Sequence, residues 1–345
     1  MVQGKDVVKE AGLVYVTDAM PGIYRKGKAG KFYYEDKDGQ RIKDEKHLNR
    51  IKALVIPPAW QNVWIANKPN AYLQVTGIDA AGRKQYKYHT KWTSRRSDHK
   101  YYRLYEFGRA LPEARKRLAK DLKRKDFDER KVLAICVDVL QKTLIRVGNE
   151  SYKQLYGSFG LTTLRDRHVK INGSKISMDF VGKKGVVQKV ELNDRNLAKL
   201  VKKCRDIPGQ ELFQFYVNGK EHKSVDSGKI NSYIKEITGD DFTAKDFRTW
   251  GGTLEALRQF STCSTGENLN SKKVVVAVLD CVAKKLGNTR AVCKSSYVYP
   301  LLLNAYEHDG LKKYLKKLSK NETAGETGLQ HDEKVLLSFL KSTSK

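Results

Sequence analysis

The sequence lacks a long apolar segment and any paired arrangement of cysteines. Its apolar stretch at 274–279 is far shorter than the roughly 20 residues that a membrane-spanning helix needs. The five cysteines are an odd number, lie far apart along the chain and form no C-x-x-C pair. A disulfide framework and a zinc ribbon are therefore excluded, and a reducing, cytoplasmic compartment is expected.

Acidic residues are also too few to balance the basic ones. Asp and Glu number 39 against 67 Lys and Arg, which gives a formal net charge of +28 over 345 residues. The hydrophobic content of 40% indicates a folded chain, so the basic surplus lies on a folded surface and attracts polyanions. Because basic residues are spread along the chain rather than gathered on one amphipathic helix, nucleic acid is favoured over a membrane as the partner.

Residues 1–92 are expected to form a β-rich N-terminal domain. Short apolar runs alternate there with turn signals, such as Asn-Lys-Pro-Asn at 67–70. Farther on, Tyr86 and Tyr88 alternate with polar residues, which on a strand places both tyrosines on one face. Residues 93–98 are polar and are interpreted as a linker to a second domain.

Residues 99–345 are expected to form a mainly helical domain with one small sheet. Apolar residues recur at spacings of three and four from 99 to 160. Between 168 and 192, alternation and an Asn-Gly pair predict a three-stranded antiparallel sheet with tight turns. Helical patterns return after 193, and roughly the last thirty residues, which end in Lys and Ser, are expected to be loosely ordered. The predicted fold class is α+β.

Four segments of the second domain carry side chains that suit chemistry on a phosphate. Arg146 ends an apolar helical stripe, so it either pairs with a buried carboxylate or binds an anion. Lys183 lies in the hairpin turn Gly-Lys-Lys-Gly, where a lysine is either solvated or directed at a phosphate. Arg248 stands beside bulky aromatics and is soon followed by Gly-Gly, which allows close backbone approach. The fourth segment, Leu-Gly-Asn-Thr, contains Asn288, and Tyr297 follows nine residues later.

Taken together and in this order, the four segments resemble the type IB DNA topoisomerases of the poxvirus and bacterial group. Residues 77–88, Gly-Ile-Asp-Ala-Ala-Gly-Arg-Lys-Gln-Tyr-Lys-Tyr, are similar to the N-terminal DNA-contacting strand of that family, and the resemblance covers about residues 50–305. It implies the catalytic fold that type IB topoisomerases share with tyrosine recombinases. It also implies that Tyr297 attacks a backbone phosphate to form a 3′-phosphotyrosyl link. The duplex then swivels, and the freed 5′-hydroxyl reverses the reaction.

The resemblance assigns a role to each of the other candidate catalytic residues. Arg146 and Arg248 would clamp the non-bridging oxygens, where charge rises in the transition state, and Lys183 would protonate the leaving oxygen. The family has histidine where this chain has Asn288. Asparagine donates a hydrogen bond but carries neither a proton nor a charge, so a donor is expected at this position, and Asn288→Ala should slow cleavage.

The resemblance further implies which residues meet DNA. Arg83, Gln85, Tyr86 and Tyr88 would face the major groove, although cross-strand packing is the alternative for both tyrosines, and Lys245 would contact a phosphate. The expected partner is double-stranded DNA, held by a monomer that clamps around it, and the expected location is a bacterial nucleoid.

No cofactor and no metal are expected. One phosphodiester is exchanged for another, so the resemblance implies a reaction without ATP. The segment 22–29 has Ala29 where a phosphate loop needs Ser or Thr to bind magnesium.

Two alternatives share some of these features. A tyrosine recombinase or integrase uses the same residue types, but it usually has histidine where this chain has Lys245, and its second arginine and tyrosine usually lie closer together than Arg248 and Tyr297. A non-catalytic DNA-compacting protein would explain the net charge, yet it predicts that at least one catalytic position has been lost. Arg146, Lys183, Arg248 and Tyr297 are all present.

Overall fold

The computed structural model describes residues 8, 12–80, 82, 84–218, 221–263, 271–318 and 328–343, without the side chains of 93–102. The chain forms two compact units, Met1–Tyr101 and Tyr102–Lys345. No helix among the described residues has the length and apolar character that crossing a membrane requires.

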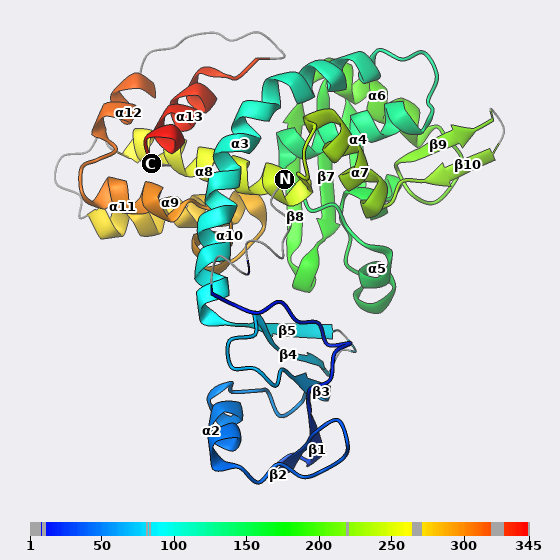
Figure 1. Cartoon of the computed structure of the whole chain (residues 1–345). Coiled ribbons are helices and arrows are strands. Elements are labelled where there is room, and N and C mark those ends of the chain that lie inside the picture. The colour runs from blue at the N-terminus through cyan, green and yellow to red at the C-terminus, as the bar shows by residue number, and fades with distance from the viewer. Residues whose placement is uncertain are drawn as a thin grey trace. The chain divides into compact units, whose positions relative to one another are not determined.

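The first unit contains an antiparallel sheet of five strands in the order β2-β1-β3-β4-β5 (Figure 1). Its elements are β1 (Ile23–Lys28), β2 (Lys31–Glu35), α2 (Glu45–Ala53), β3 (Gln61–Ile65), β4 (Leu73–Ile78) and β5 (Lys84–Tyr88). The predicted β-rich domain is thus confirmed, although α2 was not predicted. Asp44 caps this helix by accepting hydrogen bonds from the N–H groups of Lys46 and His47.

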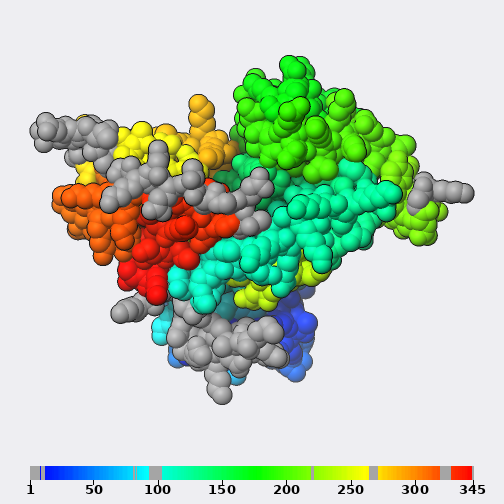
Figure 2. Space-filling model, turned by 90° about the horizontal axis from the view of Figure 1, so that it is seen from above, coloured from blue at the N-terminus to red at the C-terminus, as the bar shows by residue number. Residues whose placement is uncertain are grey.

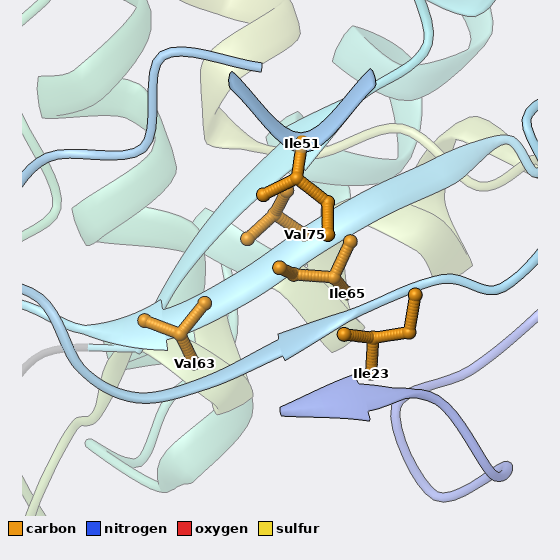
Figure 3. Close-up of a cluster of buried hydrophobic side chains, with 5 residues drawn as sticks. All are labelled: Ile23, Ile51, Val63, Ile65 and Val75. Atoms are coloured by element: carbon orange, nitrogen blue, oxygen red, sulfur yellow. The ribbon is translucent and has the colours of Figure 1, made fainter. Parts of the chain in front are cut away.

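The core of the first unit lies between α2 and one face of the sheet. Ile51 of α2 packs with four strand residues, Ile23, Val63, Ile65 and Val75 (Figure 3). The next residue along β3 from Val63, Trp64, belongs to a second cluster with Leu73, because successive side chains on a strand point to opposite faces. The sheet is therefore covered by apolar side chains on both faces.

A single long helix, α3 (Thr90–Leu122), begins in the first unit and ends in the second. It runs through residues 93–98, so the predicted helix start at 99 was wrong, and the unit division falls after Tyr101 rather than in 93–98. The sequence Thr-Ser-Arg-Arg-Ser-Asp has no apolar stripe, which made it look like a loop. A helix that runs from one unit into another can be polar on all sides.

The second unit is mainly helical and carries the predicted three-stranded sheet, β6 (Val169–Asn172), β7 (Lys175–Val181) and β8 (Val187–Asn193), in antiparallel order (Figure 1). Its other elements are α4 (Glu129–Thr143), α5 (Glu150–Tyr156), the short η1 (Leu161–Thr163), η2 (Asp166–His168) and η3 (Lys183–Gly185), α6 (Arg195–Arg205), β9 (Gln214–Val217), β10 (Glu221–Ser224), α7 (Ser227–Thr238), α8 (Ala244–Cys263), α9 (Ser271–Leu286), α10 (Arg290–Ser296), α11 (Pro300–Glu307), α12 (Lys312–Leu318) and α13 (His331–Thr343). The hairpin of β9 and β10 was not predicted, because β10 is exposed throughout and shows no apolar alternation.

The C-terminal helix α13 packs firmly, so the expectation of loose order was wrong for His331–Thr343. Four apolar side chains of this helix are buried, Val335, Leu336, Phe339 and Leu340. Glu333 forms a bidentate ion pair with Arg115 of α3, at 2.7 and 2.8 Å, and accepts a hydrogen bond from the indole of Trp250. In Figure 2, α13 (red) lies alongside the part of α3 that bears Arg115 (teal). Residues 319–327 lie outside the described part of the chain.

Candidate active site

Three helix ends and one helix interior of the second unit bring Arg146, Arg248, Asn288 and Tyr297 together. Arg146 follows α4, whose C-cap Leu144 has φ 58°. Arg248 lies inside α8, Asn288 comes two residues after the end of α9, and Tyr297 is the C-cap of α10. The predicted grouping of these four residues is therefore what the fold produces, from elements more than 140 residues apart in sequence.

Arg248 is a buried cation held by backbone carbonyls. Its side chain is 3% exposed, and its two terminal nitrogens donate to the carbonyl oxygens of Leu144 and, at 3.0 Å, of Leu286. Its guanidinium carbon lies 5.1 Å from the centre of the Tyr297 ring. The third nitrogen, Nε, is buried and has no hydrogen-bond partner among the described residues. This group therefore contains one unsatisfied buried N–H close to the tyrosine.

Arg146 is also held by uncharged acceptors. The sequence had left open whether this residue pairs with a buried carboxylate or binds an anion. Nη1 donates to the carbonyl oxygen of Gly287 at 3.1 Å, and Nη2 donates to Oδ1 of Asn288. No carboxylate in the described ranges pairs with Arg146 or Arg248. Burial and the neighbouring charge of Arg248 both lower the pKa of Arg146. Two mutually repelling cations without a counter-ion form a site that an anion would stabilise.

The hydrogen bond from Arg146 orients the side-chain amide of Asn288. Because Oδ1 accepts from Arg146, the opposite atom, Nδ2, is left as a donor, and it is buried with no partner among the described residues. An unsatisfied buried donor costs about 1–3 kcal/mol. Asn288 Nδ2 and Arg248 Nε are two such donors in one cluster, and both would be satisfied by the oxygens of a phosphate.

The Tyr297 backbone is fixed against α8. Thr253 donates its hydroxyl hydrogen to the Tyr297 carbonyl oxygen at 3.2 Å, and Tyr297 N–H bonds to the carbonyl of Cys293 at 3.0 Å. A β-carbon on Gly252 would lie 2.9 Å from the Tyr297 oxygen, and one on Gly251 would lie 2.5 Å from a methyl carbon of Leu144. The close backbone approach predicted for the Gly-Gly pair is thereby confirmed. Burial raises the pKa of the Cys293 thiol to about 11, against the lowering effect of the two arginines.

Lys183 is in the predicted hairpin turn but is not joined to this cluster. The turn is tight, with Lys184 at φ 64°, and Lys183 is exposed. Its ammonium nitrogen lies 5.9 Å from the ring centre of Tyr152 on α5.

The predicted DNA-contacting residues are placed as follows. Arg83 lies outside the described residues. On β5, Gln85 donates to the Asp79 carboxylate at 2.8 Å, and Tyr86 stacks on Tyr88 with 6.3 Å between ring centres. Tyr86 is 49% exposed, whereas Tyr88 also packs on Tyr72. Both the exposed face and the cross-strand packing considered from the sequence therefore occur in this strand.

Lys245 occupies the first turn of α8, one turn before Arg248. It is exposed, and no carboxylate in the described part of the chain pairs with it.

Sequence reasoning missed the groups that orient the arginines. The acceptors are the carbonyl oxygens of Leu144, Leu286 and Gly287, which carry no side-chain signature. One signal was readable in part: Gly287 follows the last residue of α9 and has φ +58°, the conformation that favours glycine at a helix end. Its use as an acceptor depends on where α4 ends, which the local sequence does not specify.

Comparison with known proteins agrees with this geometry. The family model for the eukaryotic DNA topoisomerase I catalytic core matches residues 89–323, and the model for the bacterial DNA topoisomerase IB N-terminal domain matches residues 31–79. The chain is 33% identical over 300 residues to DNA topoisomerase 1B of Acanthamoeba polyphaga mimivirus, covering 84% of this chain and 89% of that protein.

The chain belongs to the type IB DNA topoisomerases. It is also 25% identical over 287 residues to DNA topoisomerase 1B of vaccinia virus (strain Copenhagen) and to DNA topoisomerase I of monkeypox virus, covering 81% of this chain and 84% of each relative. The predicted family and fold class are thus confirmed: a type IB topoisomerase with a small β-rich unit and a mainly helical unit that carries a three-stranded antiparallel sheet.

Proposed function

We propose that this type IB topoisomerase relaxes supercoiled duplex DNA by transient cleavage of one strand through Tyr297. The observation that supports this most directly is the pair of buried donors without partners among the described residues, Arg248 Nε and Asn288 Nδ2, in a cluster where the Arg248 guanidinium carbon lies 5.1 Å from the Tyr297 ring centre.

In the proposed reaction the Tyr297 oxygen attacks the phosphorus atom and its proton passes to water. The bond from phosphorus to the 5′-oxygen breaks, and Lys183 supplies the proton that this oxygen needs to leave. Arg146, Arg248 and Asn288 stabilise the negative charge that develops on the non-bridging oxygens. After rotation of the duplex, the 5′-hydroxyl attacks the phosphotyrosine and restores the strand. The number of phosphodiester bonds is unchanged, so neither ATP nor a metal ion enters the scheme.

Lys183 must move in this scheme. Its ammonium group lies over the Tyr152 ring, and an exposed lysine has the rotamer freedom to leave such a contact. We place its working position at the 5′-oxygen of the bound phosphate. A cation–π contact at an exposed site is worth only about 0.5–1 kcal/mol, so breaking it when DNA binds costs little free energy.

Double-stranded DNA is the proposed substrate, held by a monomer whose two units close around it. The supporting features are the net charge of +28, the strand β5 with Gln85, Tyr86 and Tyr88, which Arg83 precedes in the sequence, and exposed Lys245, which pairs with no carboxylate among the described residues. Lys245 would contact a phosphate next to the cleavage site. Such binding should weaken steeply with salt, because phosphate contacts release counterions. We also propose a bacterial, nucleoid-associated location.

The test is relaxation of a supercoiled plasmid in EDTA without ATP. The wild type and Tyr306→Phe are expected to relax the plasmid, because Tyr306 stacks on Phe260 through its ring alone and Phe keeps that stacking. Tyr297→Phe should bind the plasmid and leave it supercoiled. If no protein relaxes it while all bind it, a compacting protein or a recombinase is the better description. Strand joining between two different duplexes would then identify a recombinase.

A further inference from the structure

Gln188 is a buried polar side chain on β8 that the proposed reaction does not use. It pairs with Phe180 of β7 and is 9% exposed. Its amide nitrogen makes two long hydrogen bonds, each of 3.4 Å, to the carbonyl oxygens of Val186 and Val187. Bonds of that length are weak. Packing, rather than hydrogen bonding, therefore holds this side chain in place.

The Gln188 side chain fills the space between two glycines. A β-carbon on Gly287 would lie 1.9 Å from Gln188 Oε1 and 2.3 Å from its Nε2, so the amide lies directly against Gly287. A β-carbon on Gly182 would lie 3.0 Å from Gln188 Cγ. Gly182 precedes Lys183, and Gly287 precedes Asn288. Gln188 therefore connects the base of the lysine hairpin to the loop that carries the asparagine.

Both glycines are themselves fixed by hydrogen bonds that matter for the site. The Gly287 carbonyl accepts from Arg146 at 3.1 Å, so its position sets that guanidinium. The Gly182 N–H donates to Val186 at 2.8 Å, and this bond closes the turn that bears Lys183. The tip of the turn is closed by a second backbone bond, from the Gly185 N–H to the Gly182 carbonyl at 3.1 Å, whereas the Lys183 side chain itself is exposed and directed at Tyr152. The distance from Lys183 to the arginine cluster is consequently set at the base of the hairpin.

We propose that Gln188 is a positioning residue that holds the Lys183 hairpin at the distance from which the lysine can protonate the leaving 5′-oxygen. This inference rests on the proposed function, because it acts through the proton transfer assigned there to Lys183. Shortening the side chain leaves a gap beside Gly287 and Gly182. The hairpin then pivots more freely, and the ammonium group reaches the oxygen less often.

The experiment compares two leaving groups in single-turnover cleavage. The substrate is a duplex with a cleavage site mapped on the wild type, carrying either oxygen or sulfur at the 5′-bridging position. A thiolate leaves without a proton, whereas an alkoxide needs one. The ratio of sulfur to oxygen cleavage rates therefore reports proton delivery. Both rates come from the same preparation, so a partly unfolded sample does not alter the ratio.

Gln188→Ala should cleave the oxygen substrate about 10-fold more slowly than wild type and the sulfur substrate within about twofold of it. Gln188→Met keeps the length and volume of the side chain and should keep the wild-type ratio. Glu191→Ala lies on the same strand, is exposed, and should match the wild type on both substrates. A raised ratio in Gln188→Ala together with a normal ratio in Gln188→Met supports the inference.

Equal slowing of both substrates by Gln188→Ala would overturn the inference, because the defect would then lie in the arginine cluster or the fold. A Gln188→Met ratio as high as that of Gln188→Ala would also overturn it. Lys183→Ala separates this failure from failure of the proposed function. If Lys183→Ala shows the raised ratio and Gln188→Ala does not, only the role of Gln188 is wrong. If Lys183→Ala itself slows both substrates equally, the assignment of Lys183 in the proposed function is wrong as well.

Discussion

Substitution of Gly287 by alanine tests how the candidate site is held together. The residue combines a positive φ of +58°, a carbonyl that accepts from Arg146, and an α-carbon covered by the amide of Gln188. Gly239 offers a matched control. It also follows a helix, has φ +76°, and has open space where a β-carbon would stand.

The two substitutions share one cost and differ in another. Alanine in the left-handed region costs roughly 1–2 kcal/mol at either position. Only at position 287 must the β-carbon also displace a buried side chain, and overpacking of that kind typically costs about 1–3 kcal/mol. Because the Gln188 amide is the end of a flexible side chain, it can swing aside, so the lower part of that range is expected. Gly287→Ala should thus be about 1 kcal/mol less stable than Gly239→Ala.

The effect on cleavage should be much larger than the effect on stability. Displacing Gln188 and the Gly287 carbonyl shifts the acceptor of Arg146, and misplacement by about 1 Å can cost about 10²-fold in rate. We expect single-turnover cleavage to fall at least about 10-fold in Gly287→Ala and to stay at the wild-type rate in Gly239→Ala. Urea denaturation supplies the stability comparison. Wild-type cleavage by Gly287→Ala would refute the reasoning, since it would show that this loop does not set the arginine.

Three further predictions follow from single contacts. Asn288→Ala should slow cleavage about 10²-fold. Asn288→Asp should slow it more, because a carboxylate there repels the phosphate. Wild-type single-turnover rates in Asn288→Ala would contradict the donor role. Glu333→Gln should lose about 2 kcal/mol of stability at pH 7, because it removes the negative charge that pairs with half-buried Arg115. Burial raises the pKa of Glu333, but the hydrogen bonds and charge of Arg115 bring it below its ordinary 4.5. This contribution to stability is therefore complete well above pH 4.5 and is lost as the pH falls through the lowered pKa. Urea unfolding that gives the same difference at pH 7 and at pH 3.5 would contradict this. Iodoacetamide at pH 8 should label exposed Cys281 before Cys204 and Cys293, because burial raises the pKa values of these two thiols to about 12 and about 11. Peptide mass spectrometry that finds Cys293 labelled first would refute this prediction.

The parts of the fold that could be predicted are those with a local cause. The Asn-Gly pair at 172–173 and the alternation after it specify β6 to β8, because a tight turn and a period of two are properties of a few neighbouring residues. The Gly-Gly pair at 251–252 likewise indicated close approach of another backbone. That this backbone would be that of Tyr297, against Gly252, depends on the packing of α8 with α10 and could not be predicted from the local sequence.

The parts that were missed depend on contacts between distant segments. The helix α13 shows buried residues at the spacing of a helix, Val335, Leu336, Phe339 and Leu340, yet its polar surroundings favoured the expectation of disorder. In the fold these residues are buried, and Glu333 of the same helix pairs with Arg115, which lies 218 residues away in the sequence. In the site, the sequence supplied the side chains but left the partner of Arg146 open. Arg146 donates to the side-chain amide of Asn288 and the backbone carbonyl of Gly287 rather than to a carboxylate. Both groups come from the residues that follow α9.

The most direct test of the central claim is to trap the protein on duplex DNA with denaturant, digest it, and identify the peptide that carries the nucleotide. We predict a single adduct on Tyr297, joined to a 3′-phosphate, and none when Tyr297→Phe is treated in the same way. An adduct on a different tyrosine, or one that persists in Tyr297→Phe, would contradict the account. The nucleophile would then not be the tyrosine of the cluster that contains the unpaired donors of Arg248 and Asn288.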